Sequence, residues 1–330
     1  MKTLFVGDAH VRESDVEEGV KLIDFVMNKA KEAEVNQIVF LGDQSHSHSI
    51  LHVDVLKFWH DSFRKLSALH DKENIRTIAL VGNHDISSTG SGNHSMLTYD
   101  FNGLCVVDAP TTINDTLYLP FYRSNEDFVN ICKQYNDIKT VVCHQEFRGA
   151  KLNAGFSSPN GVEISSIPQK CIISGHIHMA HQLYSGDQTL IYVGSPRWLN
   201  MGDANIDKQL AVYEDNRLIA SYDTSEVCSK IFCWTVTPTQ PMDMVELQRK
   251  LPHRHTFDIK GPKDFVLEQK AKLQEYGKIR TFVDREETVK VKESDGIMSA
   301  FGSYLEKFNP PNKTSKEVLG KMVAERLANG

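Results

Sequence analysis

The sequence predicts a two-sheet α/β sandwich as its main domain, because short apolar segments alternate with amphipathic segments over roughly the first 220 residues. The apolar segments are nearly continuous, which is typical of strands buried on both faces. The later segments follow one another without intervening helices, so we expect the sheets to be partly mixed or antiparallel. We expect a small α+β capping domain and a C-terminal helical tail to complete this α/β chain.

The composition indicates an ordinary globular protein that is large enough for more than one domain. The 330 residues are 40% hydrophobic and 24% charged. No apolar run approaches the ~18–20 residues that cross a bilayer, and the N-terminal segment MKTLFVGD lacks the apolar length of a signal peptide. We therefore expect a cytoplasmic protein with no membrane partner. The cysteines form no CxxC pair, and the net charge of −6 argues against non-specific coating of nucleic acid.

The main domain is expected at residues 1–225, and its elements follow from the hydrophobic pattern. Apolar residues at helical spacing predict helices, and unbroken apolar runs predict strands. The predicted helices lie within residues 16–27, 53–69 and 125–136. The predicted strands lie within residues 3–7, 37–43, 75–85, 140–144, 171–178, 189–196, 209–214 and 217–223.

The pattern changes from about residue 229, where apolar and polar residues alternate as they do in half-buried strands. We therefore expect the α+β capping domain at residues 226–293. The alternating segments are 230–238, 255–261, 279–284 and 288–293, and helix-like segments lie at 243–251 and 263–277. Residues 294–330 are expected to form two short helices, which Pro310 and Pro311 separate.

Residues that can bind a divalent metal follow five of the predicted strands directly. They are Asp8, His10, Asp43, Asn83, His144, His176 and His178, with His84 beside them. Ligands of α/β sheets bind at the carboxyl ends of strands, so these side chains can converge on one point. Carboxylate, imidazole and amide groups without thiolates favour a catalytic site for Mn²⁺, Fe²⁺ or Zn²⁺ over structural zinc. The set is too large for one ion and suits two, with Asp43 as the bridging carboxylate.

Each of these motifs has a structural explanation when it is taken alone. The segment GNHD could be a tight turn in which Asp85 caps a helix, and a lone His144 is more often a core residue. The ordered series, with each motif directly after a strand, is what indicates a site. Cations near the motif loops could contact phosphates, although each alone reads as a surface residue. They are Arg12, Arg123, Arg148, Lys151 and Arg197.

The motifs GDAH, GDQSH, GNHD, VVCH and GHIH, in this order, resemble those of the calcineurin-like metallophosphoesterases. Within that superfamily they are similar to the SbcD-type nuclease subunits of DNA double-strand-break repair and recombination complexes, including bacteriophage versions. The motifs cover residues 8–178, and the turn YVGSP extends the resemblance to about residue 200. The remainder of the chain resembles these nuclease subunits only in the order of its parts, a capping domain followed by a short helical tail. The resemblance implies a metallophosphoesterase core for the predicted sandwich.

The resemblance also implies a role for each site residue. One ion would be held by Asp8, His10, Asp43 and His178, and the second by Asp43, Asn83, His144 and His176. His84 would be the catalytic residue that meets the leaving oxygen or stabilises the pentacovalent phosphorus. His46 would support His84, although His48 in the same run, SHSHS, could take that role instead. The implied cofactors are two divalent ions, with Mn²⁺ expected.

The implied function is a manganese-dependent DNA nuclease subunit, a 3′→5′ exonuclease with some endonuclease activity. Residues 294–330 would bind an SbcC-like coiled-coil ATPase, and the chain would form a homodimer in the bacterial cytoplasm, including that of an infected host. Two alternatives stay open, namely a phosphatase or small-molecule phosphodiesterase on the same metal core, and a non-catalytic DNA-end tether. The segment GDQSHSHS differs from the GDxxDRG that is typical of protein phosphatases in the superfamily.

Overall fold

The computed structural model describes residues 1–284, apart from residues 49, 89–91 and 154, and also describes residue 321. The chain divides into two compact units. The first unit comprises Met1–Trp234, Met242–Phe257 and Tyr276–Lys278, and the second comprises Thr235–Pro241, Asp258–Glu275 and the chain from Ile279 onward. The predicted boundaries of the capping domain, 226 and 293, stay a prediction. The predicted helical tail, 294–330, lies outside the described residues except for Lys321.

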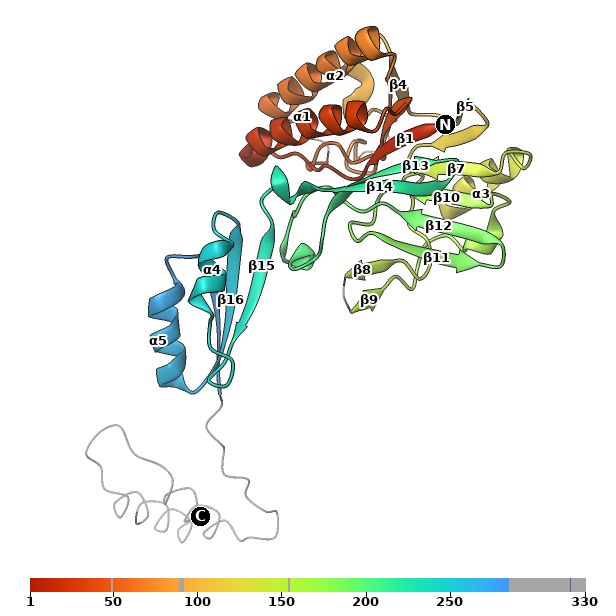
Figure 1. Ribbon diagram of the computed structural model, residues 1–330. Helices are drawn as coiled ribbons and strands as arrows, with labels where there is room; N and C mark the ends of the chain where they lie inside the picture. The colour runs from red at the N-terminus through yellow and green to blue at the C-terminus, as the bar shows by residue number, and fades with distance from the viewer. Residues whose placement is uncertain (49, 89–91, 154, 285–320, 322–330) are drawn as a thin grey trace. The chain divides into compact units, whose positions relative to one another are not determined.

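Two six-stranded sheets form the framework of the first unit (Figure 1). The first has the order β14-β13-β1-β2-β3-β4, in which β1 to β4 run parallel and β13 pairs antiparallel with β1. Its strands are β1 (Lys2–Val6), β2 (Gln37–Phe40), β3 (Arg76–Leu80), β4 (Leu104–Val107), β13 (Gln209–Glu214) and β14 (Arg217–Asp223). The parallel strands bring their carboxyl ends to one edge of the sheet.

The second sheet has the order β11-β12-β10-β7-β6-β5. Strands β12, β10, β7 and β6 run parallel, and β11 and β5 are antiparallel edge strands. The strands are β5 (Thr111–Ile113), β6 (Thr116–Leu119), β7 (Thr140–Cys143), β10 (Cys171–Ser174), β11 (His181–Ser185) and β12 (Gln188–Tyr192). A short hairpin of β8 (Lys151–Asn153) and β9 (Phe156–Ser157) follows β7 in the chain. The two large mixed sheets confirm the predicted α/β fold class.

The period-two alternation of side chains places the two sheets face to face. In β1, Leu4 and Val6 join the core under helices α1 (Val16–Glu32) and α2 (Val53–Glu73), whereas Phe5 joins a core between the sheets. In β7, Val142 faces that same central core. Its neighbours in the strand, Val141 and Cys143, pack with Phe128 of α3 (Asn125–Gln134). The first unit therefore has four layers, helix–sheet–sheet–helix.

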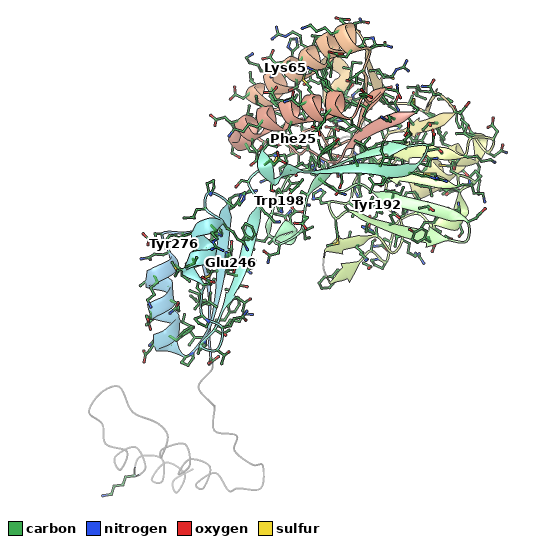
Figure 2. The ribbon with its side chains drawn as sticks, in the orientation of Figure 1. Phe25, Lys65, Tyr192, Trp198, Glu246 and Tyr276 are labelled. Carbon is green, nitrogen blue, oxygen red and sulfur yellow. The ribbon has the colours of Figure 1, made fainter. Side chains whose placement is uncertain are left out.

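Helix α1 shows that the spacing of apolar residues predicted the helix but not most of its buried face. Phe25 is 7% exposed and points into the core, whereas Lys65 of α2 points outward and pairs with Asp24 (Figure 2). Of the residues whose spacing predicted this helix, Ile23 is buried, Val16 and Met27 are partly buried, and Val20 is 39% exposed. The rest of the buried face is formed by residues that the prediction did not name, namely Gly19, Leu22, Phe25, Val26 and Ala30.

The remaining described strands form a three-stranded sheet in the order β15-β16-β17. These strands are β15 (Ile231–Val236), β16 (Arg254–Gly261) and β17 (Lys278–Val283), with helices α4 (Met244–Arg249) and α5 (Lys263–Leu273) between them in sequence. The predicted strand at 288–293 lies outside the described residues. Among the helices that the structure describes, none combines the length and the apolar character needed to cross a membrane.

Candidate metal centre

All the predicted metal ligands lie on loops that directly follow parallel strands. Asp8 and His10 follow β1, Asp43 follows β2, and Asn83 follows β3 in the first sheet. In the second sheet His144 follows β7, and His176 and His178 follow β10. Because the sheets pack face to face, their carboxyl ends bring these loops together, as expected for a binding crevice in an α/β fold.

One group of side chains consists of Asp8, His10 and His178, whose ligand atoms all lie within 4.8 Å of one another. The two Nε2 atoms of His10 and His178 are 3.1 Å apart, and Nε2 of His178 is 3.7 Å from Oδ2 of Asp8. Asp8 and His10 are buried, and His178 is partly exposed. These are three of the four residues that the resemblance implied for one metal ion, and the fourth is Asp43.

A second group consists of Asp43, His144 and His176, again with ligand atoms within 4.8 Å. The side-chain oxygen of Asn83 joins it, because Oδ1 lies 2.9 Å from Nε2 of His144 and 2.8 Å from Nδ1 of His176. Two imidazole nitrogens, an amide oxygen and a carboxylate therefore point at one small volume, which matches the ligands assigned to the other metal ion.

Asp43 connects the two groups. Its Oδ2 atom lies 3.4 Å from Nε2 of His10 in the first group and 3.4 Å from Nε2 of His144 in the second. Its other oxygen, Oδ1, accepts a hydrogen bond of 2.8 Å from the backbone N–H of His84. A single carboxylate placed between two ligand sets is the arrangement that a shared, bridging ligand requires.

Two observations show that these residues fit divalent cations. Oδ2 of Asp8 is buried and has no hydrogen-bond partner among the described residues, although buried carboxylate oxygens normally have one. The facing Nε2 atoms of His10 and His178 cannot both use lone pairs toward each other without a proton or a cation between them. The donors are hard or borderline and none is a thiolate, which suits Mn²⁺, Fe²⁺ or Zn²⁺.

The backbone adopts left-handed conformations at three of the proposed ligands. The φ angles are +44° at His10, +54° at Asp43 and +73° at His176. Residues other than glycine rarely adopt such angles, and strain of this kind is found preferentially at functional sites. Gly42, with φ of +105°, has a second constraint, because a Cβ there would lie 2.4 Å from Nδ1 of His144. The glycine that precedes Asp43 is therefore required sterically.

Hydrogen bonds around the ligands fix their orientation. Nδ1 of His144 lies 2.7 Å from the carbonyl oxygen of Leu41, so Nδ1–H donates, and Nε2 is the nitrogen that would bind a cation in exchange for its proton. Asp85 accepts hydrogen bonds from the backbone N–H groups of Gly82, Gln44 and Ser45 at 3.0 to 3.3 Å. It thereby fastens the loop after β3 to the loop after β2, and it orients the site without being a ligand.

The proposed ligands have shifted pKa values, because several ionisable side chains are buried close together. Burial raises the pKa of Asp8 to about 7, with the Asp43 carboxylate adding to this effect and His144 opposing it. Burial disfavours charge on His144, but the carboxylates of Asp43 and Asp8 raise its pKa to about 9. Burial lowers the pKa of His176 to about 3 and that of His178 to about 4, so both imidazoles are neutral at pH 7 and free to bind a cation.

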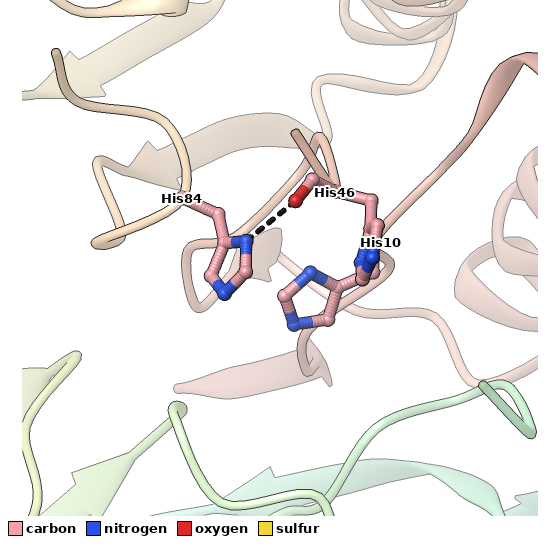
Figure 3. Close-up of side chains that lie close together, drawn as sticks. All are labelled: His10, His46 and His84. Atoms are coloured by element: carbon pink, nitrogen blue, oxygen red, sulfur yellow. Dashed lines mark hydrogen bonds between the residues drawn. The ribbon is translucent and has the colours of Figure 1, made fainter. Parts of the chain in front are cut away.

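His84 stands beside both groups and is held by the loop after β2. Its Nδ1 atom lies 2.6 Å from the carbonyl oxygen of His46, which leaves Nε2 unbonded to that loop (Figure 3). The ring of His84 meets the ring of His10 edge to face, with centroids 4.5 Å apart. It stacks on the ring of His48 at 3.8 Å and lies 5.6 Å from the ring of His46. The structure therefore brings the proposed catalytic residue together with the proposed metal ligands and with both candidate supporting histidines.

Two buried cations support the site, and the sequence did not single out their roles. Arg197 is 2% exposed and donates through Nη1 to the carbonyl oxygen of Ala9, while ion pairs hold it to Asp15 and Glu18. The prediction that Arg197 is a surface residue is wrong, because its side chain is buried and its hydrogen bond to Ala9 holds the loop after β1 in place. Only its place in the turn after YVGSP hinted at a link to the site.

Lys208 is likewise 2% exposed, and its Nζ donates to the carbonyl oxygen of His178, to Oγ of Ser195 and to Oδ1 of Asp203. The lysine is an isolated residue between a loop and a strand, so nothing in the local sequence indicated this contact. The other cations expected near the loops are at least partly exposed. Arg148 pairs with Glu163, and Arg123 donates to the carbonyl oxygen of Ser87.

Comparison with known proteins agrees with this geometry. The family described as calcineurin-like phosphoesterase matches residues 1–180, which include every proposed ligand. A protein of Invertebrate iridescent virus 3 that is named as a phosphoesterase is 28% identical over 195 residues. The alignment covers 54% of this chain and 53% of the viral protein, so the chain spans about half the length of that relative.

Proposed function

Because the chain belongs to the calcineurin-like phosphoesterase family, we propose that it is a manganese-dependent DNA nuclease subunit of the SbcD type. The proposed reaction is hydrolysis of phosphodiester bonds at DNA ends, with 3′→5′ exonuclease and some endonuclease activity. The observation that carries the proposal is the position of Asp43, whose Oδ2 lies 3.4 Å from a histidine nitrogen of each ligand group.

The proposed ligands have distinct tasks. Asp8, His10 and His178 would hold one cation, Asn83, His144 and His176 the other, and Asp43 both. A bound pair of divalent cations supplies a nucleophile at neutral pH and polarises the phosphoryl oxygens. The loops that carry these side chains are fixed by Asp85, Arg197 and Lys208, so little rearrangement is needed when substrate arrives.

His84 is the residue proposed to act on the leaving oxygen. Its Nδ1–H donates to the carbonyl oxygen of His46, so Nε2 is the atom available to the substrate. Burial lowers the pKa of His84, although the Asp43 carboxylate opposes this shift. A bound phosphodiester adds negative charge beside the ring, which favours the protonated form that can donate to a leaving oxygen.

The nuclease specificity is supported by the motif details and by the layout of the chain. The loop after β2 reads GDQSHSHS and supplies two histidines beside His84, where protein phosphatases of the superfamily typically have GDxxDRG. A further three-stranded sheet with two helices follows the core in sequence. In the SbcD-type resemblance this region would be the capping domain, and residues 294–330 would bind an SbcC-like coiled-coil ATPase in a homodimeric assembly.

The decisive experiment is incubation of the purified protein with linear duplex DNA and Mn²⁺, with and without a candidate ATPase subunit. We expect release of nucleotides from DNA ends, and no release with the His84→Ala variant. A protein phosphopeptide and a cyclic nucleotide serve as competing substrates. Hydrolysis of either of these with no attack on DNA would replace the nuclease by a phosphatase or a small-molecule phosphodiesterase.

Two further outcomes separate the remaining alternatives. Tight binding of DNA ends by a protein that hydrolyses none of these substrates would favour the non-catalytic tether. Deletion of residues 294–330 should abolish co-purification with the ATPase subunit while hydrolysis of bis(p-nitrophenyl) phosphate continues. Unchanged co-purification would contradict the role proposed for this segment.

A further inference from the structure

We infer that His48 is the positioning residue that fixes the imidazole plane of His84, an inference that rests on the function proposed for His84. The rings of the two residues stack with centroids 3.8 Å apart and planes 28° apart. This is the closest ring pair around His84 among those that the structure describes, since the rings of His10 and His46 lie at 4.5 and 5.6 Å.

A hydrogen bond holds the His48 ring in the stacking position. Its Nδ1 lies 3.1 Å from the carbonyl oxygen of Asn83, so Nδ1–H can donate to the residue that precedes His84. His48 thus contacts two consecutive residues of the loop after β3, the backbone of one and the ring of the next. Because Asn83 also supplies a proposed ligand oxygen, the contact links the position of His84 to that of the second ligand group.

The contribution of His46 to His84 is different in kind. His46 offers its backbone carbonyl to Nδ1 of His84 at 2.6 Å, a contact that any residue could make (Figure 3). The ring of His46 is farther away, and its Nδ1 is buried without a hydrogen-bond partner in the described part of the chain. The geometry therefore gives the ring of His48, rather than that of His46, the positioning role.

The two contacts restrict different motions of His84. The bond to the His46 carbonyl fixes which edge of the imidazole faces the loop, and the stack on His48 limits rotation of the ring plane. With both in place, Nε2 is held at one position relative to the ligand groups. Small losses of such alignment reduce turnover while leaving substrate binding intact.

The test compares four single variants in the full-length protein. His48→Ala removes the ring, His48→Phe keeps a ring but removes the Nδ1 donor, and His46→Ala keeps the backbone carbonyl. His52→Ala is the matched control, because His52 is an exposed histidine on the same segment that pairs with Glu13. Hydrolysis of a linear DNA substrate with Mn²⁺, whose leaving oxygen needs a proton donor, gives kcat and KM. Long-range ¹H–¹⁵N NMR of the metal-free protein reports the tautomer of the His84 imidazole.

We expect His48→Ala to lower kcat about tenfold with KM unchanged, the size of effect that loss of an aromatic pair with its hydrogen bond produces. A ring that rotates freely no longer keeps its Nδ1–H aligned with the carbonyl oxygen of His46, so the His84 nitrogen signals of this variant should shift from a single Nδ1-protonated form toward an average of both tautomers. His48→Phe should recover most of the kcat, and His46→Ala should lower kcat less than His48→Ala does. His52→Ala should match wild type.

Unchanged nitrogen signals and kcat in His48→Ala would overturn the inference, as would a larger loss in His46→Ala. The NMR readout needs neither metal nor turnover. A wild-type protein that fails to hydrolyse phosphodiesters would therefore contradict the proposed function alone, while the positioning of His84 by His48 is still judged from the nitrogen signals.

Discussion

Nε2 of His10 lies 3.1 Å from Nε2 of His178, although 168 residues separate them in the chain. Each of these nitrogens also lies near a carboxylate, because Nε2 of His10 is 3.4 Å from Oδ2 of Asp43 and Nε2 of His178 is 3.7 Å from Oδ2 of Asp8. Burial lowers the pKa of each of these histidines, so a shared proton is disfavoured at neutral pH. A divalent cation would satisfy both nitrogens, and the first prediction follows from this proposed role.

Asp8→Asn is expected to weaken binding of the first Mn²⁺ ion, because it removes the charge of a buried oxygen that has no hydrogen-bond partner in the described chain. Isothermal titration should show one tight site where the wild type shows two. The fold should persist, since asparagine has nearly the same shape and burial already raises the pKa of Asp8 to about 7. Two unaltered sites in the variant would rule Asp8 out as a ligand.

His84→Ala is expected to reduce kcat by about 10²–10⁴-fold, the usual contribution of a positioned acid or base. Binding of Mn²⁺ should be close to that of wild type, because the backbone N–H of His84, which bonds Oδ1 of Asp43, is retained. Steady-state hydrolysis of a DNA substrate and titration with Mn²⁺ measure the two effects separately. Parallel loss of metal binding would mean that His84 acts as a ligand.

Lys208→Met is expected to destabilise the protein by about 3 kcal/mol, because it leaves the buried carboxylate of Asp203 without its ion pair. It also removes the donor to the carbonyl oxygen of His178, so Mn²⁺ affinity should fall as well. Chemical denaturation measures the first effect. Lys170→Met is the matched control, because Lys170 pairs with Asp187 on the surface and its loss should leave the free energy of unfolding nearly unchanged.

The metal-free protein is expected to lose stability between about pH 6.5 and pH 9. The pKa of His144 is raised to about 9 in the folded state from an ordinary value of 6.5, against the effect of burial, by Asp43 and Asp8. The resulting stabilisation is complete below pH 6.5 and disappears as the pH rises through 9, and it amounts to about 3 kcal/mol. Denaturation in a chelator across this range should show the decline in wild type. The same decline in His144→Gln would assign it to another group.

The sequence predicted which side chains lie together in the crevice, but it did not predict the residues that surround them. The residues that meet in the crevice each follow an apolar strand directly, so the rule that ligands bind at strand carboxyl ends was enough to predict that Asp43 and His176 lie close together. Short strands such as β5 (Thr111–Ile113) and β11 (His181–Ser185) were missed, because they are edge strands whose residues lack an apolar run. The local sequence also could not predict that Arg197 and Lys208 are buried, because their burial depends on contacts with distant segments. Arg197 contacts Glu18, and Lys208 contacts the loop that carries His178.

The left-handed backbone at His10, Asp43 and His176 sets the chemistry of this protein against its stability. Glycine would relax each of these positions, where strain costs about 1–3 kcal/mol, yet glycine would also delete the side chain that the crevice uses. Directed evolution that selects for thermal stability alone should therefore favour glycine at these positions. The resulting protein would be more stable but would lack the side chains proposed to bind the cations.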